Sequence, residues 1–472
     1  MGTSLIGVTS IKLMAVFFAR LVTRRLKQAD TPTEVLQQAT RLADYLNLTA
    51  PTPNQGRTAV GCASRLSESA WWRRHLERHY RQAIDNSHRA LGQVRHGTSP
   101  YLAKPIFNEY LHAQELSQAY LARTFIESED GERLSLAEVS EHTVSNPAVR
   151  RAELMTRVRG MEEYAQAHDC AGLFITLTLP SEFHASLKKG FVNPRHDGSD
   201  PRAGNDHLGK LWSLIRAKVH RNDITPFGLR VVEPHHDGTP HWHLMLFTPK
   251  GSEQSLVSIF REYVLKDSER PDLLKRRLKI VHIDPARGSA AGYVAKYVSK
   301  NIDGANLKTD QAGRPLLDTP TRIRAWASTW RIRQFQTIGG PPVGVWRELR
   351  RLREGRGYAM GAAYEAADTG DWFGFMEAMQ HKQLCGEGRG VELMRAHTET
   401  VNRVTGEVVT SYTNRFGEPL RGKVIGVCSG ILRLPTRTRH WLGQQFEPLK
   451  VIGLAGVAGN PVTFSGNLDL CK

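Results

Sequence analysis

The chain has 472 residues, 40% of them hydrophobic, so it is long enough for two or three domains and can bury a core. A net charge of +17 points to a polyanionic partner, although an ordinary basic protein is an alternative explanation of that charge. Five scattered cysteines, never in a Cys-x-x-Cys pair, argue against a disulfide framework or a zinc ribbon and suit a reducing cytoplasm.

Residues 1–60 are predicted to form a helical tail followed by a linker. The apolar stretch Leu13–Phe18 is too short to span a bilayer, and its basic residues follow it, so neither a membrane span nor a secretory signal is expected. Thr31 and Pro32 are suited to begin a second helix that runs to Leu46.

Residues 61–168 are predicted to be a basic, wholly helical region. Its first helix carries Trp71-Trp72-Arg73-Arg74, and aromatic rings beside arginine can bind nucleic acid by stacking and charge. Arg73 and Arg74 are therefore candidate DNA-binding residues. A helix with a solvated basic face and two core tryptophans is the alternative, and the sequence alone favours it.

A third region is predicted to span residues 169–345. It begins with an apolar strand at 171–180, in which Thr176 and Thr178 share one face. A long loop follows at 188–206. Its basic residues, among them Lys188 and Lys189, are candidate contacts to a DNA backbone.

Residues 230–247, RVVEPHHDGTPHWHLMLF, predict a β-hairpin because an Asp-Gly pair separates two apolar runs. His241 and His243 flank Trp242 in the second strand, so the two imidazoles point to the same face. With the loop centred on the aspartate, Glu233 lies directly across from His241. Two imidazoles and a carboxylate on one face predict a three-ligand metal site, whereas surface or core histidines are the alternative.

Residues 292–301, GYVAKYVSKN, predict a helix with paired functional groups. Tyr293 and Tyr297 are four residues apart, as are Lys296 and Lys300, so the phenols share one face and the ammonium groups an adjoining one. Tyrosines packed on the core, with lysines in water, are the alternative. Beside a metal site, a tyrosine can act as a nucleophile on a phosphodiester, and lysines can hold the phosphate charge.

Two further segments near this helix carry candidate residues. Residues 278–284 alternate as a strand, and His282 within it is a candidate accessory metal ligand, although an ordinary strand residue is favoured. Residues 321–336 place arginines among tryptophan and phenylalanine. Arg331 and Arg333 are candidate DNA contacts there, and packing without DNA contact is equally compatible with the pattern.

Residues 346–472 are predicted to form a small mixed α and β region, to which the sequence assigns no role. Residues 359–380 are helical in pattern, and short strands alternate between 401 and 427. The sequence contains no nucleotide-binding glycine-rich loop ending in Lys-Ser or Lys-Thr, which argues against a fused helicase.

Three motifs in chain order resemble those of the HUH endonuclease superfamily: an apolar-apolar-Thr-apolar strand, the His-apolar-His strand, and Tyr-x-x-x-Tyr with interleaved lysines. More narrowly, EPHHDGTPHWH, YVAKYVSK and RIRQFQTIGGPPVGVWRELRR resemble the bacteriophage replication gene A protein family, over about residues 64–355. Antiparallel strands with helices to the side indicate an α+β fold. The resemblance, which is weak or absent at both ends of the chain, implies that the antiparallel sheet is a palm of about five strands flanked by helices. The sequence patterns add an N-terminal helical region and a small mixed C-terminal region.

The resemblance also implies an enzyme that starts phage rolling-circle DNA replication, with residues 169–345 as its catalytic core. The hairpin ligands would hold Mg²⁺ or Mn²⁺, although imidazoles alone are also compatible with Zn²⁺. One tyrosine would nick an origin strand, forming a 5′-phosphotyrosine link and a free 3′ hydroxyl. The second would transfer and rejoin the strand, and Lys296 and Lys300 would stabilise the phosphate charge.

The partners implied by the resemblance are single-stranded and origin DNA and a host replicative helicase, in the cytoplasm of a bacterial host and with no membrane. Three alternatives stay open. An HUH transposase or relaxase would share the chemistry, and a metallohydrolase would attack with metal-bound water and leave no covalent adduct. A non-catalytic DNA-binding regulator would be expected to have lost a metal ligand or the tyrosines.

Overall fold

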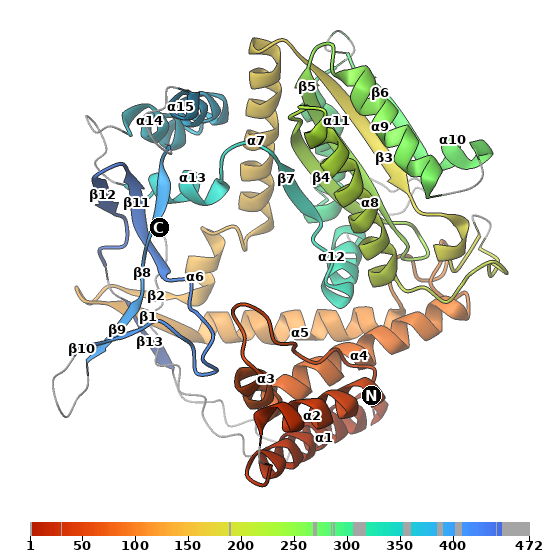
Figure 1. Cartoon of the computed structure of the whole chain (residues 1–472), viewed down its shortest axis with the longest axis vertical. Helices are drawn as coiled ribbons and strands as arrows, with labels where there is room; N and C mark the ends of the chain where they lie inside the picture. Colours follow the sequence, from red (N-terminus) through yellow and green to blue (C-terminus); the bar gives the residue numbers. More distant parts are fainter. Residues whose placement is uncertain are drawn as a thin grey trace. The chain divides into compact units, whose positions relative to one another are not determined.

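The chain folds into two compact units, each of which joins segments that are distant in the sequence. Unit 1 is residues 1–87 with 395–425, and unit 2 is residues 88–394 with 426–472. The structure is a computed structural model (Figure 1). It describes residues 2–29, 31–187, 190–267, 271–284, 286, 288–304, 318–352, 360–384, 390–401, 408–439 and 441–445. The division of the chain into four regions, which we predict from the sequence, remains a prediction.

Unit 1 is mainly helical, as its sequence predicts. The Thr31 hydroxyl caps the second helix by accepting a hydrogen bond from the Glu34 N–H at 3.4 Å. No helix in the described part of the chain is both long and apolar enough to cross a membrane. The elements of this unit are α1 (Gly2–Leu26), α2 (Pro32–Tyr45), α3 (Ala59–Leu66), most of α4 (Ser69–Ala90), β9 (Thr398–Val401) and β10 (Val408–Ser411).

A later segment of unit 1 packs closely against α3. A Cβ on Gly61 would lie 2.4 Å from the Phe416 carbonyl oxygen, so only glycine allows this approach. The Glu418 carboxylate accepts a hydrogen bond from Arg57 Nε at 2.8 Å and two from Arg65. These charge-assisted contacts join parts of the sequence that are more than 350 residues apart.

Unit 2 is built around a five-stranded sheet. The strands are β3 (Cys170–Thr178), β4 (Phe227–Pro234), β5 (Pro240–Pro249), β6 (Leu278–Ile283) and β7 (Phe335–Ile338). Their order is β6-β3-β5-β4-β7, and every neighbouring pair is antiparallel. The predicted α+β class is confirmed, and the strand number agrees with the expected palm.

Helices cover both faces of this sheet (Figure 1). We call one the α8 face, because α8 (Pro201–Arg221) and α9 (Glu253–Lys266) lie over it. The other is the α11 face, covered by α7 (Pro147–Ala167) and α11 (Ala290–Ile302). Asn146 caps α7 through a 2.9 Å hydrogen bond from the Ala148 N–H to its side-chain oxygen.

The predicted wholly helical character of residues 61–168 is wrong at one place. Thr124–Ser128 and Arg133–Ser135 form β1 and β2, which make a three-stranded sheet with β13 (Trp441–Gln445). The short run Thr-Phe-Ile favours a strand by its branched and aromatic side chains, and Ile126 is fully buried. Its partner β13 lies some 300 residues later, where local sequence patterns give no warning of it.

The remaining elements connect or flank these layers. They are α5 (Lys104–Arg123), α6 (Leu136–Glu141), η1 (Ser181–Phe183), η2 (Pro271–Leu273), α10 (Leu274–Arg277), α12 (Thr319–Trp330), α13 (Val343–Leu349), α14 (Gly361–Thr369), α15 (Trp372–Leu384), β8 (Glu392–Ala396), β11 (Lys423–Ser429) and β12 (Leu432–Pro435).

Candidate metal and tyrosine site

The β4–β5 hairpin forms with the register that its sequence predicts. Glu233 pairs with His241 across the strands, and Gly238 takes a positive φ of 82° in the turn. The His235 N–H donates to the Thr239 carbonyl at 2.7 Å and closes the loop. Because side chains alternate along a strand, Glu233, His241 and His243 all lie on the α11 face.

A buried arginine supports this turn from outside the sheet. Arg89 is fully buried, and its Nε donates to the Asp237 carbonyl at 2.9 Å. The Asp237 carboxylate accepts from the Thr239 N–H at 3.0 Å and contacts His184 Nδ1 at 3.2 Å. Burial by itself would raise the pKa of Asp237, but the hydrogen bond and charge of His184, together with Arg89, lower it. The strand ends that carry the candidate metal ligands are therefore held in place.

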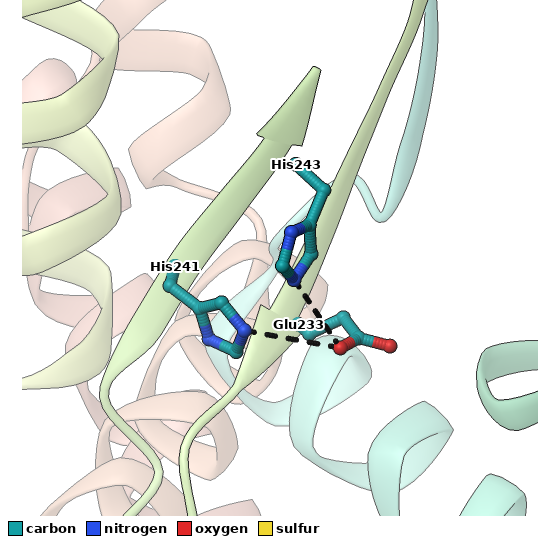
Figure 2. Close-up of side chains that lie close together, drawn as sticks. All are labelled: Glu233, His241 and His243. Carbon is teal, nitrogen blue, oxygen red and sulfur yellow. Dashed lines mark ion pairs between the residues drawn. The ribbon is translucent and has the colours of Figure 1, made fainter. Parts of the chain in front are cut away.

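The three hairpin side chains converge (Figure 2). One ligand atom from each of Glu233, His241 and His243 lies within 4.8 Å of the others. Glu233 Oε2 is 3.8 Å from His241 Nε2 and 3.5 Å from His243 Nε2. His243 Nε2 is buried without a hydrogen-bond partner among the described residues, although a polar atom inside a protein normally has one. A carboxylate with two imidazoles is a donor set that fits a divalent metal ion.

The surroundings keep the histidines suited to metal binding. Burial, followed by the neighbouring imidazoles, holds the pKa of His241 well below its usual range, so the ring is neutral as a ligand must be. A hydrogen bond of 3.1 Å joins Thr176 Oγ1 to His243 Nδ1 and leaves Nε2 directed at Glu233. The sequence placed Thr176 on one face of its strand but assigned it no role. Its pairing with His243 across β3 and β5 supplies that role.

Both tyrosines of α11 lie on the face that the four-residue spacing predicts. The Tyr297 ring centroid is 4.3 Å from that of His243, and the Tyr293 ring is 6.2 Å from Tyr297. Tyr293 is the more accessible phenol, with 45% of its surface exposed. Burial first, and then the charges of Tyr293 and Glu233, raise the pKa of Tyr297. A cation beside Glu233 would oppose the last of these effects.

Of the two predicted lysines, Lys300 reaches the site. Its Nζ lies 3.3 Å from Glu233 Oε2, whereas Lys296 is exposed one turn earlier in α11. Burial by itself lowers the pKa of Lys300, but the Glu233 carboxylate and Tyr101 together outweigh burial and raise it. For Glu233 the balance is similar: burial raises its pKa, while Lys300, His243 and Asn301 bring it below its usual range.

Asn301 is a site residue that the sequence analysis missed. It is fully buried, and its Nδ2 donates to Glu233 Oε1 and, at 2.7 Å, to the Tyr297 carbonyl. Gln334 Nε2 donates to Asn301 Oδ1 at 3.2 Å. The sequence did contain a signal for Asn301: it follows Tyr297 by four residues and so lies on the same face of the helix as the tyrosines.

Both ends of the tyrosine helix are attached to α7. The buried Glu162 carboxylate accepts from the Ala290 N–H at 2.6 Å and the Ala291 N–H at 3.0 Å, where a negative charge also suits the helix dipole. At the other end, Arg151 Nη1 lies 2.7 Å from Asp303 Oδ2. Glu162 precedes the helix by 128 residues, and no sequence pattern connects the two.

His282 is not an accessory ligand. It pairs with Leu173, and both side chains point to the α8 face, whereas Thr176 and His243 point to the α11 face. Its side chain is exposed there. The favoured alternative, an ordinary strand residue, is confirmed by the register.

In the candidate DNA-binding segments, the tryptophans are buried and the candidate arginines are exposed. Trp71 and Trp72 are 6% and 0% exposed, and the tryptophans of α12 are fully buried, so these rings pack in cores and do not stack on bases. Four arginines from the same segments are exposed, and their contact with DNA stays a prediction: Arg73, Arg74, Arg331 and Arg333. Lys188 and Lys189 lie outside the described residues.

Residues 11–305 match the family model of the bacteriophage replication gene A protein (GPA). The chain belongs to this family. The matched range contains the hairpin and α11, and therefore every predicted metal ligand and tyrosine.

Three relatives illustrate the family. The chain is 39% identical over 326 residues to the replication gene A protein of Escherichia phage 186, covering 66% of this chain and 47% of that protein. It is 37% identical over 372 residues to that of Escherichia phage P2, covering 75% and 49%. It is 35% identical over 298 residues to a probable replication endonuclease from a prophage-like region of Salmonella typhimurium, covering 61% and 36%. The chain spans about half the length of the two phage proteins. No solved structure matches it.

Proposed function

We propose that the chain is a replication endonuclease of the HUH type, which nicks one origin strand with a tyrosine and so starts rolling-circle DNA replication. One observation carries the proposal: the ring of Tyr297 lies 4.3 Å from that of His243, in a Glu-His-His cluster whose Glu233 and His243 are buried. A nucleophile next to a metal-binding donor set suits phosphodiester transfer. The name of the Salmonella relative, a probable replication endonuclease, supports the same activity.

Glu233, His241 and His243 would hold the divalent cation, Mg²⁺ or Mn²⁺ as the superfamily resemblance implies. When bound, the cation supplies charge neutralisation at a non-bridging oxygen of the scissile phosphate. Lys300 keeps a positive charge beside the same carboxylate, and Lys296 lies on the exposed side of the helix, where it can meet the phosphate.

The covalent step uses the phenols of α11. A tyrosine Oη gives up its proton and forms a bond to phosphorus, the bond from phosphorus to the 3′ oxygen breaks, and the 3′ oxygen takes up a proton. The DNA 5′ end stays on the protein as a phosphotyrosine, and the free 3′ hydroxyl can prime synthesis. Since the new bond is again a phosphodiester, rejoining requires no ATP. Tyr293 and Tyr297 on one helix face allow one phenol to hold the old end while the other attacks.

The partners in this proposal are single-stranded and origin DNA, with a host replicative helicase, in the bacterial cytoplasm. The net charge of +17 supports a nucleic-acid partner. The proposed contacts are the exposed Arg73 and Arg74 of α4 and the exposed Arg331 and Arg333 that follow α12. A regulator without activity is disfavoured, since the metal ligands and tyrosines are present and lie together.

The test is a covalent-adduct assay on a pool of single-stranded oligonucleotides with randomised sequence, so that the origin need not be known. Wild type, Tyr293→Phe, Tyr297→Phe and the double variant are incubated with Mn²⁺ and separated on a denaturing gel. We expect protein bands shifted by bound DNA in the wild type and none in the double variant or with chelator. The single variants show which phenol can act alone.

Tyr263→Phe on α9 is the matched control, because it removes a hydroxyl from a half-buried tyrosine over the α8 face. It should form the adduct as the wild type does. Cleavage of DNA without an adduct in any lane would refute the tyrosine mechanism and favour hydrolysis by metal-bound water. Absence of both cleavage and adduct across the randomised pool would refute the endonuclease itself.

A further inference from the structure

A cavity of about 370 Å³ opens on the α11 face, away from the metal ligands. It lies between α7, β7 and the Gly-Gly-Pro-Pro turn, and its size falls within the range of ligand pockets. The cavity borders Leu229, four residues along β4 from Glu233, which corresponds to about 13 Å of extended strand. It is thus separate from the metal site but on the same side of the sheet.

Three arginines line this cavity: Arg157, Arg333 and Arg347. No carboxylate is among its described lining residues. Behind the lining, Glu153 accepts two hydrogen bonds of 2.7 Å from Arg347 and lies 3.5 Å from Arg157 Nη2. Arg157 and Arg347 therefore share this carboxylate, whereas Arg333 Nε donates to the Phe335 carbonyl at 3.2 Å. Like charges gathered in a part-buried place repel one another unless an anion joins them.

Arg157 carries an open hydrogen-bond donor beside this cavity. Its side chain is only 13% exposed, and Nη1 donates to Thr337 Oγ1 at 3.1 Å. Its Nε is buried without a hydrogen-bond partner among the described residues. Burial, and further the charges of Arg347 and Arg333, lower the pKa of this guanidinium despite the opposing effect of Glu153. An anion with several oxygens would satisfy the open donor and offset the repulsion.

The turn that borders the cavity depends on glycine. Gly339 and Gly340 have φ of 63° and 71°, and a Cβ on Gly339 would lie 2.9 Å from the Phe227 side chain and 3.1 Å from the Pro226 carbonyl. The rim is therefore a defined part of the fold, formed before α13 begins at Val343.

We propose that this arginine cavity binds a backbone phosphate of the single-stranded DNA substrate at a non-scissile position, and so fixes how the strand crosses the α11 face. Guanidinium groups match phosphate oxygens in a paired geometry, which explains why arginine is used here. The separation of about 13 Å places the bound phosphate a few nucleotides from the cleaved one. The inference rests on the proposed function in one respect, that the substrate is single-stranded DNA.

The experiment measures binding by fluorescence anisotropy with the full chain in chelator, so that no cleavage occurs. Each labelled oligonucleotide of a series carries one neutral methylphosphonate in place of one phosphate. For the wild type we expect a loss of about tenfold at one non-scissile position, as for a charge-assisted hydrogen bond. Arg157→Gln and Arg333→Gln should each bind unmodified DNA about tenfold more weakly than the wild type does. The methylphosphonate at the sensitive position should cause no further loss of affinity in these variants.

Arg159→Gln is the matched control, because the Arg159 side chain lies on the same helix, is 78% exposed and pairs with the surface residue Glu163. It should bind like the wild type. Arg333 is itself exposed, so Arg333→Gln is expected to fold even if the change at the partly buried Arg157 prevents folding. In Arg157→Gln and Arg333→Gln, the slope of log affinity against log salt concentration should also become shallower by about 0.7, as expected for one lost phosphate contact.

Two outcomes overturn the inference. In the first, every methylphosphonate that weakens binding to the wild type weakens binding to both variants equally, or the protein does not bind single-stranded DNA at all. In the second, calorimetry shows that inorganic phosphate binds the wild type and not Arg157→Gln while no methylphosphonate position is sensitive, which assigns the cavity to a free anion. DNA binding with this coupling but no tyrosine adduct would refute the proposed function alone. An adduct without the coupling would refute only the arginine cavity.

Discussion

The two faces of the five-stranded sheet are made from alternate residues of the same strands, yet they bury different chemistry. On the α8 face, Trp242, Leu244 and Leu246 of β5 are almost fully buried. On the α11 face, His243 and Glu233 are 6% and 2% exposed although both are polar. Burying such groups costs free energy unless they are paired or bind a ligand. A face that carries this cost at one end of the sheet is where function is expected.

The largest effect is expected from the α11 face. His243→Ala removes one ligand and leaves Glu233 without a neighbour at 3.5 Å, so Mn²⁺ affinity should fall by more than about a hundredfold and the tyrosine adduct should disappear. Isothermal titration calorimetry measures the affinity. His282→Ala is the control, because His282 lies exposed on the other face of the same sheet. If His282→Ala lost as much Mn²⁺ affinity as His243→Ala, metal binding would not be specific to the α11 face.

A change on the α8 face should act on stability instead. Leu244 is fully buried, and Leu244→Ala should lower the free energy of unfolding of unit 2 by about 2–5 kcal/mol through lost contacts and a cavity. Denaturant unfolding measures this loss. The molecules that remain folded should bind Mn²⁺ as the wild type does. If metal affinity instead fell as far as in His243→Ala, the two faces would not be separable in function.

Asn301→Ala tests the contact between the tyrosine helix and the proposed metal ligand Glu233. Without the Asn301 donor, Glu233 is held less firmly and its pKa rises, so Mn²⁺ affinity should fall by about 10- to 100-fold. Because Asn301 lowers the pKa of this carboxyl, the variant should lose metal at a higher pH than the wild type does. Titrations at several pH values measure the shift. A parallel loss at every pH would indicate a general structural role.

The smallest effect is expected in unit 1, where a polar cluster stabilises structure. Hydrogen bonds from Arg65, Asn414 and Arg57 lower the pKa of Glu418 to about 2, from 4.5. Since the folded pKa is the lower one, the stabilisation is present above pH 4.5 and is lost as the pH falls towards 2. It should amount to about 1 kcal/mol, as for a partly exposed ion pair.

Chemical unfolding of the wild type and Glu418→Gln at pH 7, 4.5 and 3 measures this contribution. The difference in stability between the two proteins should shrink across that range, while Mn²⁺ affinity is the same in both. A difference that stays constant with pH would show that the Glu418 charge contributes nothing. Together with His243→Ala, the result would distinguish a polar cluster that stabilises from one that binds.

The sequence by itself determined the parts of the site that follow local periodicity. Residues two apart in a strand share a face, which put His241 with His243, and the Asp-Gly turn set the register that brings Glu233 opposite His241. Residues four apart in a helix share a face, which joined the two tyrosines. These rules act over a few residues, so a single chain segment carries all the information that they need.

Only the tertiary structure decided what lies opposite those segments. The contact of Asn301 with Glu233, the Glu162 carboxylate at the start of the tyrosine helix and the buried Arg89 beneath the turn join residues 68 to 148 positions apart. The order and register of the strands placed His282 on the face away from Glu233, His241 and His243. Such contacts depend on how whole elements pack, because the local pattern of a strand or helix defines its faces but not its neighbours.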